Sequence, residues 1–201
     1  MEESAFDREL LSANMVGAKS LEELYKIEKT ITHSRILALK QRPIEGKLDY
    51  THLKAIHRFL FSDIYSWAGL DRYEANIHAD FGKGDTRFTL WHRIPEVSQE
   101  LFDALEVEYF FARQDRDTFT KSIASFMNGL NLLHPFREGN GRVQRIFVEY
   151  LGSHAGHPLS FDSITAEEMM RASIAGARGH LWVMEALMRK TYLTSEDQSK
   201  K

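Results

Sequence analysis

The stretch His-Pro-Phe-Arg-Glu-Gly-Asn-Gly-Arg at residues 134–142 constrains the fold more than any other part of the chain, because it separates two helical patterns. Residues 117–133 carry apolar side chains at three-and-four spacing, which predicts a buried helix. Pro135 disfavours helical geometry at the preceding residue, so this helix should end near His134. A second helix is expected over residues 141–151, which makes the stretch a tight connection between two helices.

This connection carries groups that together predict an anion-binding site. Gly139 and Gly141 allow the backbone to turn tightly and to approach a ligand. Free N–H groups and the positive end of the helix dipole favour negative charge where the second helix begins. Arg142 and Arg145 share one helical face, from which both can bind phosphate oxygens. Glu138 suits such a site if Mg²⁺ bridges its carboxylate to phosphate.

Each of these residues also has an ordinary interpretation when it is considered alone. His134 is placed to cap helix carbonyls. Glu138 and Arg142 are spaced for a surface ion pair, and so are Arg145 and Glu149. The glycines can be turn residues. These separate interpretations give no reason for the shared spacing, so we expect a functional site.

At these residues the chain resembles the Fic family, whose signature is His-x-Phe-x-Asp/Glu-Gly-Asn-Gly-Arg and, after two further residues, a second Arg. Every fixed position is met. Residues 56–61 and 63–69 look like the helix and the Tyr-x-Trp-Ala-Gly segment of Fic domains. The resemblance runs from about Leu48 to about Leu193. It implies an all-α fold, a Fic-fold helical bundle with a small β-hairpin flap over the active site.

The resemblance implies a protein adenylyltransferase, which transfers AMP from ATP to a Tyr, Ser or Thr hydroxyl of a target protein. By this resemblance His134 is the catalytic base and Glu138 holds Mg²⁺. Phosphate binding is assigned to the backbone from Gly139 to Gly141, the Asn140 side chain, Arg142 and Arg145, with Arg145 on the γ-phosphate. The phosphorylating branch of the superfamily has a Lys where this chain has Gly141, which favours adenylylation.

Two other functions remain as alternatives. One is a Fic-fold enzyme that transfers another nucleotide or a phosphoryl group. The other is an ATP-binding interaction module, although an intact His134 argues against it because binding alone does not require a base.

Regulation is a further expectation from the resemblance. Many Fic proteins are inhibited by a helix carrying Ser/Thr-x-x-x-Glu-Gly/Asn, and no such motif lies near either end of this chain. This suggests a toxin of a toxin-antitoxin pair, inhibited by a separate small antitoxin whose glutamate binds Arg145. Self-inhibition is the alternative.

Residues 76–90 depart from the helical pattern. Apolar residues flank a Gly-Lys-Gly-Asp turn, which predicts a β-hairpin. The resemblance implies that this hairpin is the flap on which the protein substrate docks by strand pairing. A plain surface hairpin is the alternative.

The remaining chain reads as helical. Residues 20–23 and 165–168 are expected capping boxes, and Trp67 and Trp182 are expected in the core. We expect an N-terminal helical extension over residues 1–47 packing on the core, a Fic domain over 48–193, and a frayed polar tail over 194–201.

Composition and charge limit the binding partners and the cellular location that we expect for this chain. The 201 residues suit one domain, and 43% hydrophobic content argues against disorder. A net charge of −3 and a pI near 6.3 give no electrostatic footprint for nucleic acid or an anionic membrane. Without cysteine, disulfides and thiol catalysis are excluded. The start carries no basic-then-apolar leader, so we expect a cytoplasmic protein, with export by a route that leaves no such signal as the alternative.

Overall fold

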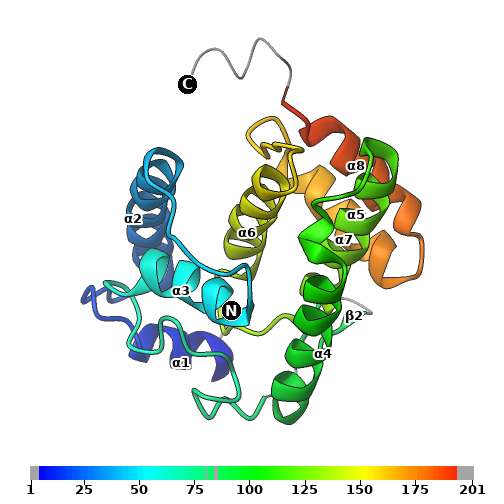
Figure 1. The fold of residues 1–201 in the computed structure, drawn as a ribbon. Helices are drawn as coiled ribbons and strands as arrows, with labels where there is room; N and C mark the ends of the chain where they lie inside the picture. Colours follow the sequence, from blue (N-terminus) through cyan, green and yellow to red (C-terminus); the bar gives the residue numbers. More distant parts are fainter. Residues whose placement is uncertain (1–4, 80, 84–85, 194–201) are drawn as a thin grey trace.

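The computed structural model describes residues 5–79, 81–83 and 86–193, and this part of the chain is mostly helical (Figure 1). The helices are α1 (Ala5–Ser12), α2 (Leu21–Gln41), α3 (Tyr50–Phe61), α4 (Ile94–Val107), α5 (Arg116–Leu133), α6 (Asn140–His154), α7 (Ala166–Ala177) and α8 (Leu181–Thr191), with 3-10 turns at Trp91–Arg93 and Tyr109–Phe111. Strands β1 (Gly82–Lys83) and β2 (Thr86–Arg87) pair antiparallel. The predicted all-α fold with a small β-hairpin is confirmed. The expected tail, residues 194–201, lies outside the described residues.

Local sequence signals set the helix ends. The Thr165 side chain and Glu168 form the full capping box of α7. The Ser20 hydroxyl accepts the Glu23 N–H at 3.2 Å, but the Glu23 carboxylate accepts the Lys19 N–H at 2.8 Å instead of the Ser20 N–H. The second expected capping box is therefore only half formed, although α2 begins where it predicts.

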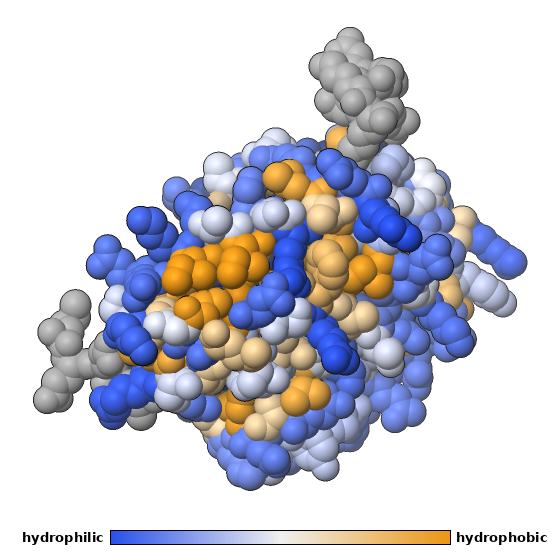
Figure 2. Space-filling view, turned by 90° about the vertical axis from the view of Figure 1, so that its left-hand side faces the viewer, coloured by the Kyte–Doolittle hydropathy of each residue, from blue (hydrophilic) through white to orange (hydrophobic). Residues whose placement is uncertain are grey.

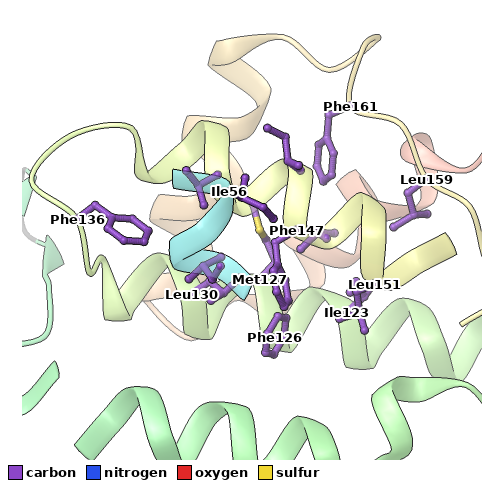
Figure 3. Close-up of a cluster of buried hydrophobic side chains, with 14 of the residues drawn as sticks. Ile56, Ile123, Phe126, Met127, Leu130, Phe136, Phe147, Leu151, Leu159 and Phe161 are labelled. Atoms are coloured by element: carbon purple, nitrogen blue, oxygen red, sulfur yellow. The ribbon is translucent and has the colours of Figure 1, made fainter. Parts of the chain in front are cut away.

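Helices α5 and α6, which flank the motif stretch, form the centre of the core. Met127 and Leu130 of α5 and Phe147 of α6 have no exposed surface, and Figure 3 shows them in one cluster with Ile56 of α3. In Figure 1, α2 and α3 lie on one side of α6 while α5, α7 and α8 lie on the other. Burying each such side chain contributes roughly 1.5–3 kcal/mol, so both ends of the motif stretch start from firmly packed helices.

The two tryptophans expected in the core behave differently. Trp67 is half-buried and stacks on Tyr65, with ring centroids 4.4 Å apart. Trp182 is 68% exposed, so its expected burial is wrong. Met184 and Met188, one turn apart, define the buried face of α8, and position 182 lies about half a turn away from that face.

The N-terminal residues pack on the rest of the molecule. Helix α2 contacts α1 and α3, and Leu24 and Leu39 of α2 are buried. The boundary at residue 47 stays a prediction. In the described part of the chain, no helix combines the length and apolar character needed to cross a membrane.

Candidate active site

The end of α5 places the His134 imidazole at a cavity. His134 adopts the left-handed conformation, with φ 42° and ψ 57°, and its N–H bonds to the Leu130 carbonyl at 3.1 Å. Its half-buried ring stacks on Phe88 after β2, with centroids 3.8 Å apart and planes 6° apart. His134 lines a cavity of about 240 Å³ together with Gly141 and Arg145. The structure therefore brings the predicted base and two predicted phosphate-binding residues to one cavity.

Asn140 holds the motif stretch in shape. Its Oδ1 accepts the Phe136 N–H at 2.9 Å and its Nδ2 donates to the Phe136 carbonyl at 2.7 Å. Phe136 is 1% exposed. The Phe136 backbone thus occupies the Asn140 amide oxygen and one of the two amide N–H donors, and contact of this side chain with the phosphates stays a prediction. Besides the second N–H of this amide, Asn140 can offer a ligand its backbone N–H.

His57 of α3 packs against the motif stretch, and the sequence alone did not identify it as a site residue. Its ring stacks on Phe136 with centroids 3.9 Å apart. Nδ1 accepts the Gly69 N–H at 2.8 Å, so Nε2 carries the proton and donates to the Glu138 carbonyl at 3.1 Å. Burial lowers the pKa of His57 from 6.5 to about 3, which keeps the ring neutral. The two weaker Fic-like stretches therefore meet at the motif through this one histidine.

Arg72 is a second residue that sequence reasoning missed. Its side chain is fully buried. Nε donates to the His134 carbonyl at 3.1 Å and Nη2 to the Thr89 carbonyl at 2.7 Å, while the guanidinium lies 4.6 Å from the Phe81 ring centre. One guanidinium thus holds the hairpin and the motif stretch together.

The start of α6 supplies amide donors. Gly139, at φ 82°, is the N-cap residue, and as a glycine it has no side chain to cap this helix end. The Arg142 N–H is the first of the helix to bond back, to the Gly139 carbonyl at 3.1 Å. Helix geometry leaves the N–H groups of Asn140 and Gly141 without intrahelical acceptors, which favours an anion there.

Glu138 and Arg142 form the ion pair that their spacing allows. Arg142 Nη2 lies 3.4 Å from Glu138 Oε1 and 2.7 Å from Glu28 Oε1. The Glu138 side chain is 33% exposed, so its carboxylate is also open to a cation. Among the described residues no cluster of three or more His, Asp or Glu is arranged for a metal. A single open carboxylate next to a phosphate site still fits Mg²⁺, which commonly takes one or two carboxylates and leaves its other positions to phosphate and water.

Arg145 stands between two cavities. It lines the cavity of His134 and also a neighbouring groove of about 390 Å³, together with Arg142. Burial, and then the charge of Arg142, lower the pKa of Arg145, while Glu149 raises it. Within the described part of the chain its guanidinium makes no hydrogen bond or ion pair of its own. Such a partly desolvated cation is a strong site for an anion.

The far wall of the His134 cavity is an apolar slot. Helix α7 contributes Met169, Met170, Ser173 and Ile174, and Phe88 closes the hairpin side. The capping box at Thr165 predicted the helix but gave no signal for the direction of this face. A mostly apolar slot beside a candidate anion site suits a nucleotide base.

Comparisons with known proteins agree with this geometry. The model of the Fic/DOC family matches residues 47–151. The chain is 34% identical over 177 residues to a probable protein adenylyltransferase Fic of Salmonella typhimurium, covering 88% of this chain and 85% of that protein. It is equally identical, 34% over 177 residues, to the protein adenylyltransferase VbhT of Bartonella schoenbuchensis, but spans only 36% of VbhT.

Solved structures give the same family. The N-terminal Fic domain of a putative cell filamentation protein from Bartonella quintana, with bound ADP, has a TM-score of 0.81 and 28% identity, covering 94% of this chain and 93% of that one. BepC of Bartonella tribocorum, with bound AMPPNP, has a TM-score of 0.80 and 25% identity, covering 90% of this chain and 92% of that one. The family match, the motif and the shared fold together establish that this chain belongs to the Fic/DOC family.

Proposed function

We propose that this chain is a protein adenylyltransferase, which transfers AMP from ATP to a Tyr, Ser or Thr hydroxyl of a target protein. The observation that carries the proposal is the shared cavity in which the His134 imidazole and the Arg145 guanidinium meet at the start of α6. Nucleotidyl transfer requires a general base and an anion-binding group that act on the same bound nucleotide. Relatives named as adenylyltransferases and neighbours with bound ADP and AMPPNP support it.

The nucleotide lies along the cavity in this proposal. The base occupies the apolar slot of α7, and the phosphates lie on the N–H groups at the start of α6. Arg145 binds the γ-phosphate, and Arg142 contributes its remaining donors from its fixed position. Glu138 holds Mg²⁺, which offsets phosphate charge when bound.

His134 acts on the target hydroxyl. The imidazole takes the proton, the hydroxyl oxygen bonds to the α-phosphorus, and the bond to the bridging oxygen breaks, so that pyrophosphate leaves. Stacking on Phe88 and the hydrogen bond from Arg72 to the His134 carbonyl fix the imidazole before substrate arrives. A preorganised base of this kind typically contributes 10²–10⁴-fold, as an order-of-magnitude estimate.

The hairpin is the proposed docking site of the target. Thr86 of β2 lines the same cavity as His134, so a segment added along the hairpin runs past the base. Strand addition supplies backbone hydrogen bonds that do not depend on the target's side chains.

We propose inhibition by a small antitoxin at the groove beside Arg145. This groove lies between α2, α6 and the start of α7 and is lined by His33, Ile36, Leu37 and Lys40 of α2. Figure 2 shows the side of the molecule that carries α2, where hydrophobic surface lies on both sides of a hydrophilic strip. An amphipathic helix with one glutamate fits such a groove, because its apolar face covers Leu37 while the carboxylate reaches Arg145.

The proposal includes a cytoplasmic location, since the reaction consumes ATP.

Labelled ATP tests the function. The chain is incubated with Mg²⁺, a bacterial lysate and ATP labelled at the α-phosphate, and mass spectrometry identifies any protein that gains the mass of AMP. The His134→Ala variant should bind ATP normally and transfer nothing, while His92→Ala, an exposed histidine, should match the wild type. Label transferred from the γ-phosphate instead would identify a phosphoryl transferase, and a fully active His134→Ala would reject the role of the base.

A further inference from the structure

The first motif arginine is held by a helix outside the motif and outside the region that matches the family. Arg142 Nη2 lies 2.7 Å from Oε1 of Glu28 on α2, and Arg142 Nη1 lies 3.2 Å from the Thr32 hydroxyl. The family model begins at residue 47. Helix α2 therefore reaches into the phosphate site from a part of the chain to which nothing so far assigns a role there.

Glu28 is itself fixed from a second side. It is 4% exposed, and the Tyr65 hydroxyl donates to its Oε2 at 2.5 Å. The Thr32 hydroxyl donates to the Glu28 carbonyl at 2.8 Å, one turn away on the same helix. A carboxylate bonded through both oxygens and buried cannot swing away, so it acts as a fixed anchor.

The free-energy cost of breaking the ion pair with Glu28 keeps Arg142 in place when a nucleotide binds. Separating Arg142 from Glu28 would leave a buried, uncompensated carboxylate, and that penalty exceeds what one new phosphate contact returns. Arg142 also lies over the Phe61 ring, 4.8 Å from its centre, and contacts Glu138 at 3.4 Å. The guanidinium thus has one position, in which it also restrains the proposed metal carboxylate.

We infer that Glu28 is a positioning residue of the nucleotide site: it fixes the Arg142 guanidinium, and through it Glu138, for the phosphates and Mg²⁺. The inference rests on the proposed function. It makes α2 part of the active site, while Arg145, for which the described residues provide no such anchor, binds the outer anion.

Affinity for AMPPNP with Mg²⁺, measured by calorimetry, tests the inference. Glu28→Gln keeps the shape of the side chain and removes its charge, and should weaken binding roughly tenfold. The matched control is Glu22→Gln, an exposed glutamate on the same helix, which should bind as the wild type does. Tyr65→Phe removes only the hydrogen bond to Glu28 Oε2 and should weaken AMPPNP binding less than Glu28→Gln does. This variant provides a test if Glu28→Gln folds poorly. Affinities are compared well below each variant's Tm.

A double-mutant cycle separates positioning from general stability. In an Arg142→Gln background, Glu28→Gln should weaken AMPPNP binding less than twofold, because the residue it positions is already gone. Unchanged or tighter binding by both Glu28→Gln and Tyr65→Phe, or equal losses in the two backgrounds, would overturn the inference. A wild-type chain that binds AMPPNP but transfers no AMP would reject the proposed function instead and leave this coupling measurable.

Discussion

Arg72 Nε donates a hydrogen bond to the His134 carbonyl oxygen at 3.1 Å, so a residue that precedes the motif by 62 positions fixes the backbone of the proposed base. The same guanidinium holds Thr89, whose N–H bonds to the Leu132 carbonyl at 2.9 Å. The hairpin and the end of α5 therefore share one anchor. A displacement of the hairpin would therefore act on the backbone of the proposed base.

Substituting Arg72→Met should both destabilise the chain and loosen the hairpin. The two carbonyls of His134 and Thr89 lose a charged donor in a buried place, at about 1–3 kcal/mol each. We expect urea unfolding to show a loss of at least about 2 kcal/mol. Hydrogen exchange at residues 86–89 should become faster. The control is Arg87→Met, an exposed hairpin arginine. Unchanged exchange in Arg72→Met would contradict the shared anchor.

Arg145→Ala should weaken binding of a triphosphate more than binding of AMP. A hydrogen bond to a charged group contributes about 1.5–3 kcal/mol, which corresponds to a loss of roughly 10- to 100-fold for AMPPNP. Affinity for AMP, which lacks the outer phosphates, should change little. Calorimetry with both nucleotides measures the difference.

Two further variants make the Arg145 comparison specific. Arg145→Lys keeps the charge but loses the planar fork, so its AMPPNP affinity should fall between those of the wild type and the alanine variant. Arg171→Ala removes an exposed arginine from α7 and should leave both affinities unchanged. Equal losses for AMPPNP and AMP in Arg145→Ala would exclude its place at the γ-phosphate.

The parts of this fold that the sequence predicts are encoded locally. The end of α5 follows from Pro135, the start of α7 from Thr165 and Glu168, and the hairpin from apolar residues around a glycine-containing turn. Each signal acts within a few residues. The motif spacing likewise placed His134 and Arg145 at one cavity.

The supporting residues could not be predicted because their partners lie far away in sequence. His57 and Glu138 are 81 positions apart, and Glu28 and Arg142 are 114 apart. Periodicity and capping rules carry no information over such separations. Asn140 shows a different limit: its amide has two possible uses, and only the folded loop reveals that the Phe136 backbone takes it.

His57 should make stability depend on pH below neutrality. Its folded pKa is about 3 and its unfolded pKa 6.5, so between these values the unfolded chain binds the extra proton. The contribution is fully present above pH 6.5 and is lost as the pH falls, at about 1.4 kcal/mol per unit. Urea unfolding at several pH values from 4.5 to 7.5 measures it.

Matched histidine variants isolate this effect. His57→Gln removes the titrating group and should flatten the dependence by about one proton. His33→Gln removes an exposed histidine from α2 and should keep the wild-type slope. If His57→Gln kept that slope as well, another group would be responsible for the acid sensitivity.

Gly139 should be the least replaceable glycine of the motif, because a side chain there would clash with a neighbouring ring. Comparison with Gly156 separates the cost of this clash from the cost of the left-handed backbone. Both have similar backbone angles, φ +82° and +80°. A Cβ at Gly139 would lie 2.3 Å from the Phe61 ring, whereas among the described residues no atom beyond the two chain neighbours lies within 4 Å of a Cβ at Gly156. Gly156→Ala should therefore cost only the left-handed strain, about 1–2 kcal/mol. Gly139→Ala adds a clash with a packed ring, about 1–3 kcal/mol more in urea unfolding. Equal losses would mean that the Phe61 ring yields freely and does not fix the motif.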